Sequence, residues 1–509
     1  MISSSLKQLI EKTLKEWEVP GIAIALVEKD ESGQWGVTTE GFGMRDSKQA
    51  VDEKTLFAVA SNSKLFTALS VSMIIARSEG KIKYTTKIKD LLPEFSMKDK
   101  LASERCTLED LLCHRSGLGR FNDLLAYEKL DDLPGCISAL DSAADFRDVY
   151  LYNNWAYDLL ALIVQRVSGI EYHLFVQRNI LDPLGMAYTT FELDKAGGNV
   201  ATGHWRHGET ADGAGKNIEL ANGLNMGRGL RGAGGMMSNA KDMAIWLRTL
   251  LEQGGANLPD DSVKQFFKDS IRGRTIVDVV AETSDLTPKL YGLARRIGSY
   301  QGVQFIEHGG AVSGHMSQVC VIPDHNFGVA LMTNSSPWGD LVYNIIKWRL
   351  FEEKCGLKRV DWNARYTARR QRELQAASPE YIFPAVPVDT TPVPISDAEL
   401  CSTYTSGGLS LTVSKVVPRS DFPQLEALPH FPMMWGRVSV ILAHRSGRVY
   451  DGCLEYTPLG QEGVKMHGKK MVVEVEVEGD TVRGLGIKGM IGAPVTRTGE
   501  AQADIYFAK

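Results

Sequence analysis

The sequence predicts an α+β domain followed by a small all-β domain, and three observations support this. A chain of 509 residues is longer than one ordinary core requires, so two domains are expected. Strand-like apolar runs occur near the N-terminus and again between about residues 290 and 335, with helical patterns between them. Short alternating strands follow residue 400. We expect domains at residues 1–360 and 396–509, joined by a helical and proline-rich linker at 361–395.

Composition and charge narrow the classes of function. The chain is 43% hydrophobic and 23% charged, as soluble globular proteins are. Its net charge of -5 and the lack of a Lys/Arg run argue against nucleic acid as a partner. The seven cysteines are scattered and form no CxxC pair. They predict reduced thiols in a cytoplasmic protein, without a zinc site or other metal and without a cofactor.

The N-terminal region predicts a helix and a hairpin. Apolar residues recur at helical spacing between charged ones, which indicates an amphipathic helix rather than a signal peptide: Leu6, Ile10, Leu14 and Trp17. "GIAIALVEK" (21–29) and "GQWGVTTEGFG" (33–43) predict two paired strands. No apolar run approaches the roughly 18 to 20 residues that span a bilayer, so membrane insertion is not expected.

The middle of the chain is mainly helical and ends in strands. Residues 65–80 and 158–169 form the clearest helical patterns, each closing at a glycine. Four strands are expected after them, at 291–298, 305–310, 317–324 and 327–335. Strands at both ends of the domain predict one antiparallel sheet with helices beside it.

The last part of the chain changes character. Residues 362–380 are charged and helical in pattern, and "FPAVPVDTTPVP" (383–394) holds four prolines, as an extended linker does. Beyond it, alternating segments with turn signals at Ser446-Gly447 and Gly479-Asp480 predict strands at 409–417, 437–450 and 471–487. This pattern indicates a β-barrel or a β-sandwich.

A serine and a lysine three residues apart are the first candidates for catalysis. In "FAVASNSKLFTAL" (57–69), Ser61 and Lys64 would share one face of a helix that starts at Ser61. The positive end of the helix dipole and the Ser61 amide would help to bind an oxyanion. Taken alone, such a pair is more often an N-capping serine and a solvated lysine than a catalytic pair.

Two further segments favour the interpretation of Ser61 and Lys64 as a catalytic pair. Tyr152 and Asn154 stand just before an apolar helix, and a strand ends in His308-Gly309-Gly310. In this order, the three motifs resemble the SxxK, Y-x-N and H-x-G set of the serine β-lactamase and penicillin-binding-protein family. The tyrosine variant is similar to class C β-lactamases and the related esterases, D-aminopeptidases and acyltransferases.

The resemblance extends over roughly residues 1–350. Three other segments look like family segments: "TLEDLLCHRSGL" (107–118), "GAGGMMSNAKDMAIWLRTLL" (232–251) and "PDHNFGVALMTNSS" (323–336). The resemblance implies a β-lactamase-like domain, with an antiparallel sheet flanked by helices and a helical subdomain. The C-terminal β-domain is similar in general pattern to the lipocalin-like domains appended to some family hydrolases.

The resemblance also implies roles at the reacting centre. Ser61 would be the nucleophile, which needs a base within hydrogen-bond reach. Lys64 and Tyr152 would act as a coupled pair, and the sequence leaves open which of them takes the proton. Asn154 would hold Lys64 and orient the substrate carbonyl.

The third motif would bind substrate. Gly309 and Gly310 would let a substrate lie along the edge strand, and the amides of Ser61 and Ala311 would form the oxyanion hole. His308 stands where β-lactamases usually carry lysine and would serve mainly as a hydrogen-bonding group toward Tyr152 or the substrate.

Nearby residues have plainer explanations. Tyr150 is expected to be a core residue, because only Tyr152 stands two before an asparagine in this helix-start context. Ser63 is expected to be a structural hydroxyl, and His114 to fix a loop. His315 lies seven residues after His308, but no carboxylate or cysteine is spaced to complete a metal site.

We therefore expect a cytoplasmic serine hydrolase that acts through an acyl-enzyme on Ser61. Its substrate would be a small-molecule ester, lactone or amide, in metabolism or secondary-metabolite processing. His308 and the lack of an export signal argue against antibiotic resistance and cell-wall processing. The alternatives are an acyltransferase with the same acyl-enzyme and a non-catalytic scaffold. A homo-oligomer is possible.

Overall fold

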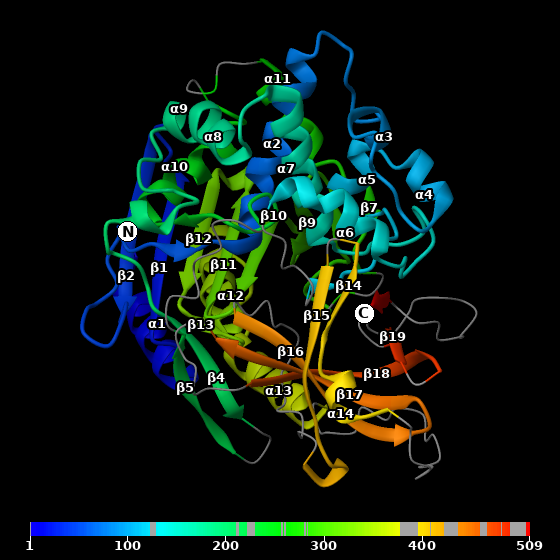
Figure 1. Cartoon of the computed structure of the whole chain (residues 1–509). Coiled ribbons are helices and arrows are strands. Elements are labelled where there is room, and N and C mark those ends of the chain that lie inside the picture. Colours follow the sequence, from blue (N-terminus) through cyan, green and yellow to red (C-terminus); the bar gives the residue numbers. More distant parts are fainter. Residues whose placement is uncertain are drawn as a thin grey trace.

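The first domain is built around one eight-stranded sheet that takes strands from both ends of the domain, as expected (Figure 1). The structure is a computed structural model, and it describes residues 2–122, 129–209, 213–220, 230–255, 258, 261–278, 281, 283–376, 395–407, 409–421, 436–458, 466–479, 481–488 and 505–509. The strand order is β2-β1-β12-β11-β10-β9-β8-β7. The bounds are β1 (Gly21–Lys29), β2 (Trp35–Gly43), β7 (Thr275–Ile276), β8 (Leu290–Tyr291), β9 (Arg296–Tyr300), β10 (Val303–Val312), β11 (His315–Ile322) and β12 (Phe327–Thr333). The N-terminal hairpin thus joins the later strands through the antiparallel pair β1 and β12.

One segment differs from its expected form. Residues 291–298 were expected to be one strand, but they form the end of β8, a turn and the start of β9. The turn is closed by the Gly292 amide donating to the Arg295 carbonyl, and Ala294 takes a left-handed φ of 57°. The chain therefore reverses here, which places Tyr291 directly opposite Arg296.

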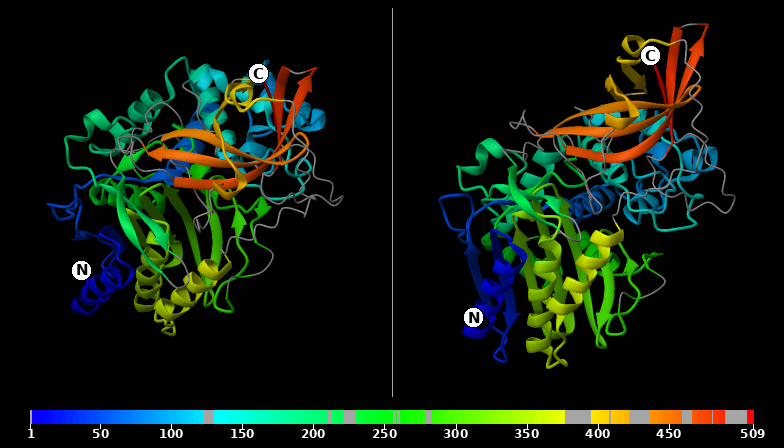
Figure 2. Two further views of the ribbon diagram at one scale, coloured as in Figure 1. Left: turned by 60° about the horizontal axis from the view of Figure 1, so that its bottom comes forward. Right: turned by 90° about the horizontal axis from the view of Figure 1, so that it is seen from below.

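Helices cover both faces of the sheet. Because side chains alternate along a strand, Ile22, Ile24 and Leu26 of β1 join the apolar cluster of α1 (Ser4–Trp17), α12 (Gly339–Cys355) and α13 (Trp362–Ala376). Figure 2 shows these helices together on one side of the sheet. On the other face, Ala23 and Ala25 leave room for α10 (Ala240–Leu251).

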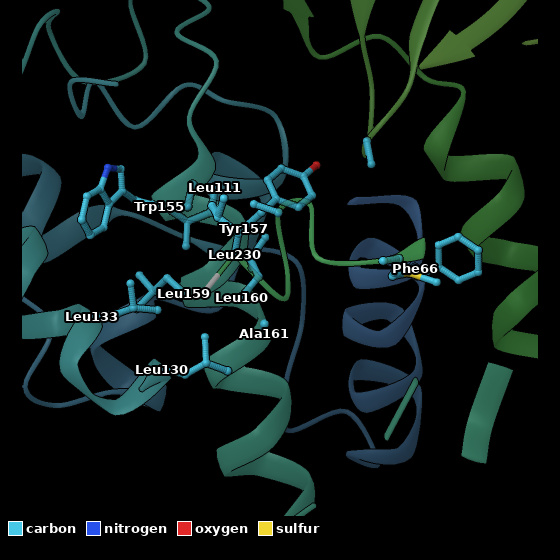
Figure 3. Packing of buried hydrophobic residues seen from close by; sticks show 14 of the residues in the cluster. Phe66, Leu111, Leu130, Leu133, Trp155, Tyr157, Leu159, Leu160, Ala161 and Leu230 are labelled. Carbon is cyan, nitrogen blue, oxygen red and sulfur yellow. The ribbon is translucent and has the colours of Figure 1, made fainter. Parts of the chain in front are cut away.

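The helical subdomain is packed around α2 (Ser63–Arg77) and α7 (Asn154–Ser168), as expected from the sequence. The buried residues of α2 run without a gap from Ser63 to Ile74, as in a central helix. Figure 3 shows Leu159 of α7 beside Leu133, whereas Phe66 extends from the far side of α2. Phe66 stacks on Trp246 of α10 with 4.2 Å between ring centroids. The smaller helices are α3 (Ile88–Leu91), α4 (Lys100–Arg105), α5 (Leu108–Leu112), α6 (Leu133–Ala139), α8 (Tyr172–Val176), α9 (Asp182–Leu184) and α11 (Asp261–Ser270).

Over the described ranges, no single helix is both long and apolar enough to cross a bilayer. The α7 helix and the helical segment Tyr172–Leu184 meet the length and composition requirement only as a pair, which bends by 76° at its break.

The C-terminal domain is a closed barrel rather than a sandwich. Its order is β14-β15-β16-β17-β18-β19-β20, and β20 returns to pair with β14. The turn at Gly447 joins β16 and β17 as predicted. The bounds are β14 (Thr403–Ser406), β15 (Leu409–Val416), β16 (Gly436–Ser446), β17 (Val449–Pro458), β18 (Met466–Glu478), β19 (Thr481–Lys488) and β20 (Ile505–Ala508), preceded by α14 (Asp397–Leu400).

The barrel packs on the helical subdomain through the turn between β14 and β15 (Figure 1). A Cβ on Gly407 in this turn would lie 2.4 Å from the Gly135 carbonyl oxygen of α6. The apolar interior of the barrel is continuous with the cluster around α6. The predicted proline-rich linker at 383–394 lies outside the described residues, but α13 just before it lies against the first domain, where Trp362 stacks on Trp348.

Candidate active site

Ser61 lies in a single 3-10 turn, Ala60–Asn62, between β3 (Phe57–Ala58) and α2. Ala60 holds a φ of 48°, in the left-handed region that non-glycine residues rarely adopt and that is often found at functional turns. The Ser317 hydroxyl of β11 donates to the Val59 carbonyl at 2.7 Å and accepts from Nδ2 of the Asn62 side chain at 2.8 Å. The neighbouring strand therefore holds the turn that presents Ser61.

Ser61 is not a helix cap. No side chain caps the 3-10 turn or α2. Instead, Lys64 Nζ lies 3.1 Å from Ser61 Oγ. Ser63, the other serine at this helix start, donates to the Ala60 carbonyl and accepts from the Met236 amide, which makes it a structural hydroxyl.

Lys64 is fully buried, and its amine has three neighbours. One neighbour is Ser61 Oγ. The amine donates to the other two, which are Asn154 Oδ1 at 2.7 Å and the Ala233 carbonyl at 2.6 Å. Burial lowers the pKa of Lys64 well below its ordinary value; the Asp158 carboxylate opposes this shift, while the charges of Arg120 and Arg296 add to it. The surroundings thus favour the neutral amine.

Tyr152 is the second group on Ser61. Its ring lies beneath the amine of Lys64, with 4.8 Å from Nζ to the ring centroid. Burial raises the pKa of Tyr152 to about 12, although a hydrogen bond with Ser61 and the charges of Arg296 and Arg120 pull it down. The phenol therefore keeps its proton at neutral pH.

The start of α7 positions the second motif. Asn153 caps the helix by accepting from the Ala156 amide, and its own amide donates to the carbonyls of Leu118 and Gly119. His114 Nδ1 accepts from the backbone amide of Asn153, so His114 fixes this loop, as the sequence suggested. With Asn153 turned toward the loop, Asn154 points its carbonyl at Lys64.

His308 is directed at a partner that the sequence did not indicate. Its Nδ1 lies 2.7 Å from the Gly309 carbonyl and its Nε2 lies 3.0 Å from the Tyr291 hydroxyl. A carbonyl only accepts, so Nδ1 carries the proton and Nε2 accepts from Tyr291. Burial, followed by the charges of Arg296 and Lys64, lowers the pKa of His308 well below its ordinary value. The imidazole is neutral, and its ring centroid is 6.3 Å from that of Tyr152.

The two glycines of the third motif differ in their surroundings. A Cβ on Gly310 would lie 2.2 Å from the Val59 carbonyl oxygen, 2.4 Å from Ser317 Oγ and 3.2 Å from the Ser61 amide nitrogen. Strand β10 therefore passes directly across the Ser61 turn. A Cβ on Gly309 would have side-chain ends as its nearest atoms, 3.1 Å from Gln318 Oε1 and 3.4 Å from the Tyr343 hydroxyl, and would lie 3.9 Å from the Ser317 carbonyl oxygen. Ala311, the next residue of β10, is half-buried.

Three charged residues of the site were not found from the sequence: Arg120, Asp158 and Arg296. Asp158 accepts from the amides of Gly232 and Ala233, which places the Ala233 carbonyl on Lys64. Its position four residues after Asn154, on the same face of α7, is a signal that could have indicated it. No local pattern marks Arg120 or Arg296, because only tertiary packing brings them to Tyr152.

The remaining candidates stay outside the reacting centre. The Tyr150 phenol interacts with the Arg296 guanidinium, and burial raises the pKa of Tyr150 to about 12. His315 is also buried, with its ring at 6.0 Å from that of Phe57. No group of three or more His, Cys, Asp or Glu side chains able to hold a metal ion occurs among the residues described.

Comparison with known proteins gives several related chains. "Unguisins hydrolase ungD" of Aspergillus violaceofuscus is 27% identical over 418 residues, which cover 77% of this chain and 73% of that relative. "Unguisins hydrolase ungD'" of Aspergillus campestris is 25% identical over 410 residues with the same coverage. "Protein flp" of Staphylococcus aureus is 22% identical over 339 residues, 65% of this chain and 62% of the relative.

The fold has a counterpart among solved structures. The octameric penicillin-binding protein homologue from Pyrococcus abyssi matches with a TM-score of 0.57 and 18% identity over the full length of both chains. At this identity, the likeness concerns the fold alone.

The family model is decisive, because it spans both ends of the sheet and all three motifs. The model named Beta-lactamase matches residues 6–351. The chain belongs to the serine β-lactamase and penicillin-binding-protein family.

Proposed function

We propose that the protein is a serine hydrolase that forms an acyl-enzyme on Ser61 with a small-molecule ester, lactone or amide. The observation that carries this proposal is the set of partners around the Lys64 amine. In its neutral form the amine has two N–H bonds, and Asn154 and the Ala233 carbonyl accept both. Its lone pair is left for the Ser61 hydroxyl, 3.1 Å away.

The proposed acylation begins with Lys64. The amine takes the Ser61 proton while Oγ attacks the substrate carbonyl carbon. The backbone amides of Ser61 and Ala311 would bind the resulting oxyanion. Tyr152, which is protonated at neutral pH, gives its proton to the leaving alcohol or amine as the bond to the carbonyl breaks.

The next steps restore the enzyme. The Lys64 ammonium returns a proton to the Tyr152 phenolate beside it, so both groups regain their starting forms. Water then attacks the acyl-enzyme by the same route in reverse, releasing the carboxylic acid and Ser61. The hydrolase names of the Aspergillus relatives support water as the acyl acceptor.

The proposal is tested by intact mass spectrometry after incubation with a fluorophosphonate and with a panel of activated esters and thioesters. We expect one adduct, on Ser61, that is lost in Ser61→Ala. Ser63→Ala is the matched control, because it removes the neighbouring structural hydroxyl and should still label. Both variants should fold, because Ser61 caps no helix, and because the loss of the Ser63 hydroxyl leaves the Met236 amide unpaired at a cost of about 1 to 3 kcal/mol.

Each other outcome contradicts part of the proposal. An adduct at another residue would overturn the choice of nucleophile. No adduct in the folded wild type would favour a scaffold. Product analysis with an added alcohol would show an ester as the main product if the enzyme were an acyltransferase.

A further inference from the structure

Two consecutive arginines at the start of β9 lie in different surroundings. Arg295 stands over the ring of Phe267, with 5.2 Å from Cζ to the centroid, and only burial acts on it, lowering the pKa of Arg295 to about 9. Arg296 interacts instead with the phenols of Tyr150, Tyr152 and Tyr291. Adjacent side chains of an extended backbone point to opposite sides, which explains the difference. One arginine therefore lies away from the active site and the other lies within it.

The environment of Arg296 is a group of aromatic rings around Tyr152. Arg296 is opposite Tyr291 in the β8–β9 register. The ring of Tyr150 lies 5.3 Å from that of Tyr291 and 6.5 Å from that of Tyr152. The charge of Arg296 thus acts on Tyr152, the residue that contacts Ser61, and β9 lies beside β10, the strand that carries the third motif.

No ion pair joins a carboxylate to this guanidinium among the residues that the structure describes. Glu307 is opposite Arg296 in the β9–β10 register, but it is paired with Lys289 at 3.1 Å and with Lys347 at 2.8 Å. Arg296 Nε has no hydrogen-bond partner among the described residues. A charge in a buried setting that no opposite charge offsets acts strongly on its neighbours, because little water screens it.

The third motif does not supply a charge of its own. Both ring nitrogens of His308 are engaged, one donating to the Gly309 carbonyl and the other accepting from Tyr291. We propose that Arg296 is a positioning residue that supplies the fixed positive charge of this active site, in place of the lysine that the third motif often carries. This inference rests on the function proposed for Ser61 and Lys64.

The expected effect of Arg296 is on the protonation of Lys64. The groups that act on Lys64 come from four parts of the chain. They are Asp158, Tyr152 and Tyr157 from α7 and its preceding segment, His114 and Arg120 from the loop before them, Arg296 from β9 and His308 from β10. Asp158 favours the ammonium, whereas Arg120 and Arg296 favour the free amine. Removing the charge of Arg296 shifts this balance toward the ammonium, which cannot act as a base.

The test measures how the rate of Ser61 labelling by a fluorophosphonate depends on pH. Fluoride leaves without needing a proton, so the acid limb of this profile reports the base alone. In Arg296→Met we expect the acid limb to move up by about one pH unit or more. The rate of Ser61 labelling should be about tenfold slower than in the wild type at pH values below the limb, and the plateau of the rate at higher pH should be similar in both proteins. Arg296→Lys should restore the wild-type profile, because it keeps the charge.

Arg295→Met is the matched control. It removes the adjacent arginine, which lies in the turn before β9 and packs on Phe267, and it should leave the profile unchanged. If Arg296→Met does not fold by circular dichroism, Arg296→Gln replaces it and should show the same shift. An unchanged acid limb in the uncharged variant, or an equal shift in Arg295→Met, would overturn the inference. Failure of the proposed function is distinct, because wild-type Ser61 would then not label at any pH.

Discussion

The two glycines of the third motif allow a sharp test of how closely β10 approaches Ser61. In Gly310→Ala, the new Cβ would lie 2.2 Å from the Val59 carbonyl oxygen and 2.4 Å from Ser317 Oγ. Ordinary contacts of this kind need more than about 3 Å, so strand and turn must separate by about 1 Å. Val59 immediately precedes the 3-10 turn that carries Ser61, so this movement displaces the nucleophile.

The expected loss follows from that displacement. A misplacement of about 1 Å costs on the order of 10²-fold in rate, and the forced packing costs about 1 to 3 kcal/mol of unfolding free energy. Gly309→Ala is the matched variant, since its Cβ meets the flexible end of Gln318 at 3.1 Å and the strand need not move. Its labelling rate should stay within about twofold of wild type.

The assay is the rate constant for fluorophosphonate labelling of Ser61, together with kcat/KM for the best ester and a thermal melt of each variant. The reasoning fails if Gly310→Ala labels as fast as Gly309→Ala. It also fails if both variants lose activity equally, because the close approach of β10 would then not be specific to Gly310.

Three more predictions concern the tyrosines, acid stability and substrate charge. Tyr152→Phe should lower kcat/KM by about 10² to 10⁴, whereas Tyr150→Phe should change it little, because the hydrogen bond with Ser61 is made by Tyr152. Equal effects would show that the motif is set in the wrong register. Three buried histidines, His114, His308 and His315, have lowered pKa values. The folded protein therefore keeps them neutral, whereas the unfolded chain protonates them below pH 6.5. The stability that comes from keeping these histidines neutral should therefore be fully present above pH 6.5, and the unfolding free energy should fall by about 4 kcal/mol per pH unit below about pH 6. A melting temperature that does not change between pH 7 and 5.5 would contradict this. Because His308 is neutral, a short-chain nitrophenyl ester should exceed a chromogenic cephalosporin in kcat/KM by more than about tenfold at pH 7 to 8, and a smaller ratio would show that another group binds the cephalosporin carboxylate.

Local patterns in the sequence were enough for the main elements and for the order of the motifs. Helical spacing of Leu6, Ile10, Leu14 and Trp17 predicted α1, whose buried face contains these four residues. Alternation and apolar runs predicted β1, β2, β10, β11 and β12, but not β7 or the turn that separates β8 from β9. Ser61 and Lys64 could be paired from their separation alone, because residues three apart share one side of a helical turn.

Long-range contacts decided the rest. Whether the last strands form a barrel or a sandwich depends on the pairing of β20 with β14, about a hundred residues apart, and turn signals carry no information on such closure. The direction of His308 was also undetermined, because its partner Tyr291 enters the site only through the β8–β9 turn.

The sequence by itself determined which residue types meet at each local step: the serine and lysine of one turn, the tyrosine and asparagine before one helix, and the glycines of one strand. Only the tertiary structure decided their protonation and the groups that control it. The pKa of Lys64 is lowered because the side chain is buried, and because the charges of Arg120 and Arg296 act on it. Burial and the distance between charges are properties of the packed chain, and residues as far apart in sequence as Lys64 and Arg296 have no local pattern that joins them.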